Sequence, residues 1–263
     1  MIFAMKRADT AQHIVHHVLD AIEHAADVAE PFAHLELSNI FPPDVYAAMV
    51  ENMPGAHDYR PMSGRSKEAR RDDGVPTRTK MDLLPEHIRH LSPAQRAVWE
   101  PVGEALCCDA VREAFRRRLA VGLEKRFGDE AKTVRMYPIP VLTRDVAGYR
   151  IGIHPDTRRK AMTIQLYLPR DESIRHVGTA FHRHVGPGKK DFAEARRMPF
   201  TPNVGYAFAV GEDTWHGVET LGPEVSTRDS ILLTYFVDQD TSDRVYNRGK
   251  RFGNFLLGLV RKR

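Results

Sequence analysis

The N-terminal part of the chain carries apolar residues at helical spacing. Between residues 8 and 29 they recur every three or four positions without Gly or Pro, which predicts an amphipathic helix that ends before Pro31. The run 34–41 has the pattern of a short strand. A second helix is expected from Pro43, because Pro suits the first helical turn, to about residue 53.

Residues 54–80 interrupt this pattern, since they are charged and rich in Gly and Pro. So long a connection is typically a functional lid or a disordered segment, and we expect residues 57–80 to be poorly ordered without substrate and to close over it when it binds. A further helical pattern begins at Ser92, a candidate N-cap, and reaches about Phe115. Pro101 lies inside this pattern and predicts a break or kink there.

After Gly128 the pattern changes to short β-type runs separated by turn residues. Many strands at close spacing predict an all-β sandwich or barrel. We therefore expect a mainly β fold in a single domain over 1–263. It would have a helical N-terminal part over about 1–130, a β core over about 131–240 and a basic C-terminal tail over 241–263.

Composition narrows the class of protein. Apolar residues make up 42% of the chain, enough for a core, and no apolar run is long enough to span a membrane. The first residues do not resemble a signal peptide, and the only two cysteines, Cys107 and Cys108, are adjacent, so we expect a reduced, cytoplasmic protein. The net charge of +4 is mild, and solvated faces explain the basic clusters better than a nucleic-acid surface does.

The candidate chemistry lies in the β half. His154 and Asp156 form a His-x-Asp pair at the end of a predicted strand, and side chains two positions apart share one face of a strand. One such pair is expected by chance in this chain, and a surface turn around Pro155 would by itself explain it. His216, before a later strand, would complete a set of two histidines and one carboxylate, the ligand set of a non-haem Fe(II) site with open positions.

Other polar residues alternate onto shared strand faces. Arg228 and Ser230 lie two positions apart on the last strong predicted strand. A guanidinium offers a planar fork for a carboxylate, so Arg228 suits a dicarboxylate co-substrate, with the Ser230 hydroxyl beside it. Thr163, Gln165 and Tyr167 share one face of the strand after the His-x-Asp pair. A core aromatic with a satisfied hydroxyl is the alternative interpretation of Tyr167.

The candidate residues resemble the Fe(II)- and 2-oxoglutarate-dependent dioxygenases, and most of all their prolyl-hydroxylase-like branch, through His154-x-Asp156, His216 and Arg228-x-Ser230. In that branch a tyrosine-bearing strand follows the His-x-Asp pair, as the strand with Tyr167 does here. A Gly-Thr strand comes next, which here begins at Gly178. The likeness covers about residues 135–238, and the first 130 residues carry no motif of the family.

The resemblance implies a double-stranded β-helix, a jelly-roll of cupin type built from two four-stranded sheets, with iron at its open mouth. It implies Fe(II), 2-oxoglutarate and O2 as cofactor and co-substrates, with succinate and CO2 released. The residues that it implies for the site are His154, Asp156 and His216 for the metal, and Arg228, Tyr167, Ser230 and Thr163 for 2-oxoglutarate.

Asp156 also bears on the reaction that the resemblance implies. Halogenating relatives carry a small residue at this position, so the carboxylate favours hydroxylation, desaturation or cyclisation. The Arg and Lys content of the chain around 54–80 favours a small anionic or amino-acid-like metabolite as substrate. Two alternatives stay open: hydroxylation of a protein side chain, and a non-catalytic β-barrel that only binds a ligand. The oligomeric state also stays open.

Overall fold

The computed structural model describes residues 7–62, 74–188 and 191–238. Its α-helices are α1 (Arg7–Glu23), α2 (Pro43–Glu51), α3 (Pro93–Leu106), α4 (Asp109–Arg118) and α5 (Ala120–Phe127). Short 3-10 helices are η2 (Ala56–Asp58), η3 (Gly128–Lys132) and η4 (Arg175–Val177). The strands are β1 (Ala26–Val28), β2 (His34–Ser38), β3 (Arg60–Pro61), β4 (Arg78–Asp82), β5 (Met136–Asp145), β6 (Ile151–His154), β7 (Lys160–Tyr167), β8 (Ala180–His184), β9 (Phe192–Arg197), β10 (Val204–Ala209), β11 (His216–Val218) and β12 (Arg228–Val237).

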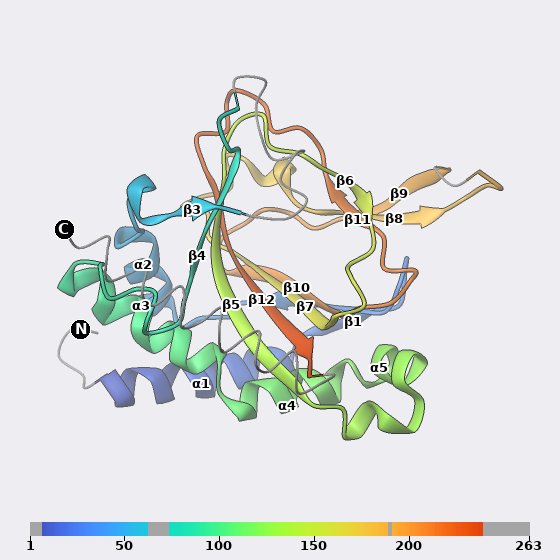
Figure 1. Ribbon diagram of the computed structural model, residues 1–263, viewed down its shortest axis with the longest axis horizontal. Helices are drawn as coiled ribbons and strands as arrows, with labels where there is room; N and C mark the ends of the chain where they lie inside the picture. Colours follow the sequence, from blue (N-terminus) through green and yellow to red (C-terminus); the bar gives the residue numbers. More distant parts are fainter. Residues whose placement is uncertain (1–6, 63–73, 189–190, 239–263) are drawn as a thin grey trace.

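The strands form two antiparallel sheets, and helices cover one face of the larger sheet (Figure 1). The larger sheet has eight strands in the order β1-β2-β10-β7-β12-β5-β4-β3. The smaller sheet has four strands in the order β6-β11-β8-β9. The mainly β architecture with flanking helices that the sequence predicts is therefore confirmed.

The larger sheet is wider than the four strands expected for each half of a double-stranded β-helix. Its central strands β10, β7, β12 and β5 all come from the predicted β core. The N-terminal part, predicted to be helical, adds β1 and β2 at one edge and β3 and β4 at the other. Adding a strand at an edge gives partners to backbone groups that would otherwise stay unpaired. The N-terminal part is thus a mixture of helices and strands.

The first helix is shorter than its pattern predicts. α1 ends at Glu23, and β1 occupies residues that were predicted to be helical. β1 pairs with β2, with Ala26 opposite Glu36, so its backbone gains hydrogen bonds in the sheet in place of those of a longer helix. The helix predicted from Pro43 does begin there.

Of the break or kink predicted at Pro101, the break is wrong. α3 continues through Pro101, which is buried, and the chain turns only at Cys107–Cys108, before α4. A proline removes one hydrogen bond of a helix, whereas the apolar face of α3, including the fully buried Trp99, packs into the core over the whole helix. Ser92 caps α3 as predicted, because its side chain accepts from the backbone N–H of Gln95.

Two strands lie in the stretch predicted as one long loop. β3 pairs with β4, and β4 pairs with β5, with Met81 opposite Leu142. Met81 packs into the core on the helix side. Arg78 and Lys80 therefore alternate onto the opposite face, which faces the smaller sheet and is called the inner face from here on. Charged residues on that inner face hide the strand pattern in the sequence. The lid predicted for 57–80 falls partly on residues 63–73, which lie outside the described residues.

Side chains of the larger sheet alternate between two cores. On β12, Ile231 and Leu233 pack against the helices. On the other face, Tyr206 and Phe208 of β10 meet Phe181 of β8 between the two sheets. Polar residues on this inner face, among them those predicted for the site, therefore point between the sheets. No helix among the described residues is long and apolar enough to cross a membrane.

Candidate metal centre

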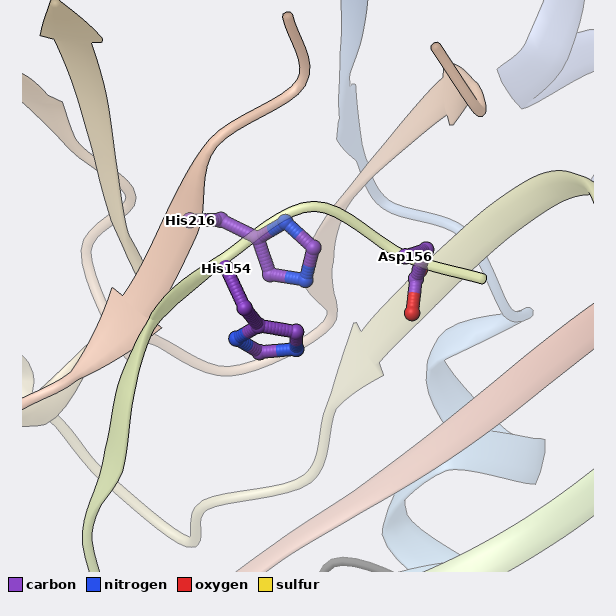
Figure 2. A group of neighbouring side chains, drawn as sticks. All are labelled: His154, Asp156 and His216. Carbon is purple, nitrogen blue, oxygen red and sulfur yellow. The ribbon is translucent and has the colours of Figure 1, made fainter. Parts of the chain in front are cut away.

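The three residues predicted to bind metal lie together (Figure 2). His154 ends β6, Asp156 follows in the connection to β7, and His216 begins β11. β6 and β11 are antiparallel neighbours, with His216 directly opposite His154. One ligand atom from each of the three residues lies within 4.8 Å of the other two, a spacing that permits one ion to be held between them.

The backbone orients both imidazole rings. Nδ1 of His154 lies 2.8 Å from the carbonyl oxygen of Gly152, and Nδ1 of His216 lies 2.9 Å from the carbonyl oxygen of Thr214. A carbonyl oxygen can only accept, so each Nδ1 donates its proton, and each Nε2 carries the lone pair that a metal requires. The two ring centroids are 4.6 Å apart.

Asp156 is held as a carboxylate. Its side chain is 7% exposed, and its two oxygens accept 2.6 Å hydrogen bonds, Oδ1 from Lys160 and Oδ2 from Thr163. Burial alone would raise its pKa, but the charge of Lys160 and the hydrogen bonds from Lys160 and Thr163 lower the pKa well below the usual range of an aspartate. A carboxylate offers about four acceptor positions, so both hydrogen bonds leave room for a metal.

This donor set suits a ferrous ion. Two imidazoles and one carboxylate are the ligands of non-haem Fe(II) sites, and they leave positions for a co-substrate. Within the described parts of the chain, these residues are the only group of three His, Cys, Asp or Glu side chains spaced to hold a metal. A second histidine pair at strand spacing, His182 and His184 of β8, lies outside this group.

Arg228, predicted to bind the co-substrate, is fully buried at the start of β12. Its Nη1 donates to Asp145 at 2.9 Å, its Nε to the carbonyl of Val177 at 2.8 Å, and its Nη2 to the hydroxyl of Thr179 at 3.2 Å. Asp145 of β5 is directly opposite Arg228, and Arg78 of β4 is directly opposite Asp145. The sequence pattern identified Arg228 but neither of these two partners.

A network of hydroxyl groups lies beside this arginine. The hydroxyl of Tyr167 donates to the hydroxyl of Thr179 at 3.0 Å and accepts from the Thr179 backbone N–H at 2.9 Å. Tyr206 donates to Gln165 at 2.8 Å, and Gln165 in turn donates to Ser230 at 2.9 Å. Buried polar groups in a network of this kind are held in one arrangement.

The four residues predicted for co-substrate binding occupy two places. Thr163 lies at the metal side, where it contacts Asp156. Arg228, Tyr167 and Ser230 belong to the buried network farther along the inner face. All four are buried on the predicted face. Their contact with a co-substrate stays a prediction.

Solved structures show the fold. The chain is similar to a prolyl-4-hydroxylase of Pseudomonas putida, with a TM-score of 0.51 and 16% identity over 85% of this chain and 99% of that chain. Weaker likenesses are to an oxidoreductase of the 2OG-Fe(II) oxygenase family from Burkholderia pseudomallei (TM-score 0.41, 14% identity, 88% of this chain and 90% of that chain) and to a prolyl 4-hydroxylase of Phytophthora capsici (0.46, 11%, 95% and 76%). No protein-family model and no curated protein matches the sequence. The first likeness identifies the fold as the double-stranded β-helix of that prolyl-4-hydroxylase.

Proposed function

We propose that this protein is an Fe(II)- and 2-oxoglutarate-dependent oxygenase. The observation that carries the proposal is the grouping of His154, Asp156 and His216, with both imidazoles oriented by backbone carbonyls and the carboxylate held ionised. The buried guanidinium of Arg228 on the same inner face supports it, because a dicarboxylate co-substrate needs a cation at its far end.

The residues take distinct parts in this proposal. His154, Asp156 and His216 would hold the ion on one side, and Thr163 would keep the carboxylate oriented. When bound, iron with 2-oxoglutarate and O2 supplies the oxidising chemistry that hydroxylates a substrate and releases succinate and CO2. Arg228 would bind the distal carboxylate of 2-oxoglutarate, and the buried aromatic residues between the sheets would exclude water.

The proposed reaction is hydroxylation, or desaturation or cyclisation by the same chemistry. Asp156 occupies the position at which a halide would need space, so the product should be independent of chloride. Chloride titration of the O2-dependent reaction tests this point, and a chlorinated product would contradict it.

We infer a small anionic or amino-acid-like substrate. Arg60 of β3 and Lys80 of β4 lie opposite each other on the inner face of the larger sheet. Both contact Asp82. Basic side chains on this inner face favour an anionic ligand.

Turnover with and without an intact ligand set tests the function. The protein, loaded with Fe(II) and ascorbate, should convert 2-oxoglutarate and O2 to succinate, faster with a true substrate than without one. Amino acids and small carboxylates form the first substrate panel, and unstructured peptides form the second, so the panel also tests hydroxylation of protein side chains. His216→Ala is the matched blank. Succinate formation that never exceeds this blank, together with absent Fe(II) binding, would reject the proposal in favour of a non-catalytic barrel.

A further inference from the structure

Three charged side chains lie in one row across the larger sheet. Arg78, Asp145 and Arg228 are directly opposite one another on the adjacent strands β4, β5 and β12, and they share its inner face. Asp145 and Arg228 are fully buried, and the side chain of Arg78 is 13% exposed. Arg78 holds Asp145 with two hydrogen bonds, of 2.6 and 2.8 Å, while Arg228 contacts the same carboxylate at 2.9 Å.

The charges of this row do not balance. Among the described residues, two guanidinium groups face one carboxylate, which leaves one positive charge in excess on a buried surface. The adjacent cross-strand pair, Arg144 and Asp229, does not supply the missing negative charge. These two side chains point to the other face of the sheet and pair with each other there, at 2.7 and 3.2 Å. An uncompensated buried charge is strongly unfavourable, so the row is suited to an anion that supplies the missing charge.

The donors of Arg228 point to the same conclusion. A guanidinium has five N–H groups, and those of Arg228 meet Val177, Asp145 and Thr179 among the described residues. These contacts use three of the five, so among the described residues one N–H on each terminal nitrogen is available to a further acceptor such as a carboxylate. Arg78 is held by Asp145 and by the ring of Tyr149, whose centroid lies 4.2 Å from its guanidinium carbon.

We propose that Arg78 is a positioning residue for recognition of the distal carboxylate of 2-oxoglutarate. It holds Asp145, which in turn holds Arg228, and it supplies the charge that keeps the row positive after Asp145 has neutralised one guanidinium. Without Arg78, Asp145 and the co-substrate carboxylate compete for Arg228 alone. This inference rests on the proposed function, and it adds a residue from the N-terminal part of the chain to the site.

A pair of ligands isolates the distal carboxylate. 2-Oxoglutarate and 2-oxopentanoate have the same carbon chain and the same chelating end, and only the former carries a distal carboxylate. The ratio of their Kd values, measured by calorimetry on the full chain loaded with Mn(II), therefore reports recognition of that group alone. A defect in folding or metal binding weakens both ligands and leaves the ratio unchanged.

We expect a large ratio in the wild type and a roughly twentyfold smaller one in Arg78→Gln. This is the factor for a unit charge two strand spacings, or about 9 Å, away at an effective dielectric constant of about 20. The double variant Arg144→Gln/Asp229→Asn removes a paired arginine together with its carboxylate at the adjacent position on the opposite face, so the net charge is unchanged and the wild-type ratio should be kept. A wild-type ratio in Arg78→Gln would overturn the inference. Absence of binding by either ligand to the wild type would instead reject the proposed function.

Two further variants distinguish an effect of the lost Arg78 charge from an effect of structural damage by the substitution. Arg78→Lys keeps the charge and should keep most of the ratio. In the double variant Arg78→Gln/Asp145→Asn the row regains one net positive charge, and the new amide oxygen can still accept from Arg228, so the ratio should recover. A double variant as poor as Arg78→Gln would show that the charge of Arg78 is not what the co-substrate requires.

Discussion

His154 and His216 lie directly opposite each other on strands β6 and β11, with their ring centroids 4.6 Å apart. A cross-strand pair brings two side chains to one face of a sheet regardless of the chain between them. Both rings donate Nδ1–H to a carbonyl two residues earlier, at Gly152 and Thr214. The register of two short strands therefore places both imidazole ligands of the candidate metal centre.

Loss of any one proposed ligand should abolish metal binding. His154→Ala, Asp156→Ala and His216→Ala should each weaken Fe(II) binding by more than about 100-fold, because even residues that only support a ligand commonly contribute 10–100-fold. Metal content after anaerobic loading measures the effect. His184→Ala is the control, since this exposed residue of the neighbouring strand β8 contacts Phe192 and lies outside the ligand group. Full Fe(II) affinity in His216→Ala would show that this residue is not a ligand.

Thr163 should tune the metal site without binding the ion. Thr163→Val removes the 2.6 Å hydrogen bond to Asp156 at nearly constant volume, and we expect Fe(II) affinity to fall by about 10–100-fold. Thr234→Val makes the same change in a buried residue directly opposite on β12 and should leave the affinity unchanged. Equal Fe(II) titration curves for both variants and the wild type would contradict this role.

Replacement of Arg228 should weaken the binding of 2-oxoglutarate and leave the binding of the metal unchanged. Arg228→Gln removes a charged donor from a buried carboxylate site, so 2-oxoglutarate binding should weaken by about 2–5 kcal/mol while Fe(II) still binds. Tyr167→Phe removes one hydroxyl from the network around Thr179 and should weaken 2-oxoglutarate binding less, by about 1–3 kcal/mol. Isothermal titration of the Mn(II)-loaded proteins gives both values. If the arginine variant kept wild-type 2-oxoglutarate affinity, another cation would have to hold the distal carboxylate.

Stability should depend on pH through His34. Burial of this side chain lowers its pKa from the ordinary 6.5, although the Phe32 carbonyl and the charge of Glu36 act to raise it. The unfolded chain therefore takes up the proton first, so the contribution of neutral His34 is present above about pH 6.5 and is lost as the pH falls toward the folded pKa. Between pH 7 and 5, the free energy of unfolding of the metal-free wild type should fall more than that of His34→Phe.

Urea unfolding at both pH values measures the difference. His184→Phe is the control, because this residue is exposed and its replacement should leave the wild-type pH dependence in place. Parallel loss of stability in the wild type and in His34→Phe would show that His34 does not titrate between the folded and unfolded states.

Local spacing in the sequence was sufficient to place several candidate residues on shared strand faces. Two-residue alternation placed Thr163 and Tyr167 on one strand face, and both are buried on the inner face of β7. The same alternation placed Arg228 beside Ser230. These predictions held because a strand fixes the direction of its own side chains, whatever it pairs with.

Other features depended on contacts between distant segments. The pattern of 8–29 reads as one helix, yet residues 26–28 form a strand because β2 offers a partner for their backbone. Pro101 lies inside α3, where the burial of one helix face outweighs a lost hydrogen bond. Neither outcome is visible in a local pattern, since each is decided by what packs alongside.

The sequence by itself identified the three candidate metal ligands, because His154 and Asp156 share a strand face and His216 stands before a later strand. Only the tertiary structure decided that Arg78, Asp145 and Arg228 form one buried row. Arg78 belongs to a charged stretch without strand periodicity, and its neighbours arrive from β5 and β12. The register of a sheet is set by pairing between strands that are far apart in the chain. The spacing of residues along the sequence therefore does not show which charged side chains end up opposite one another.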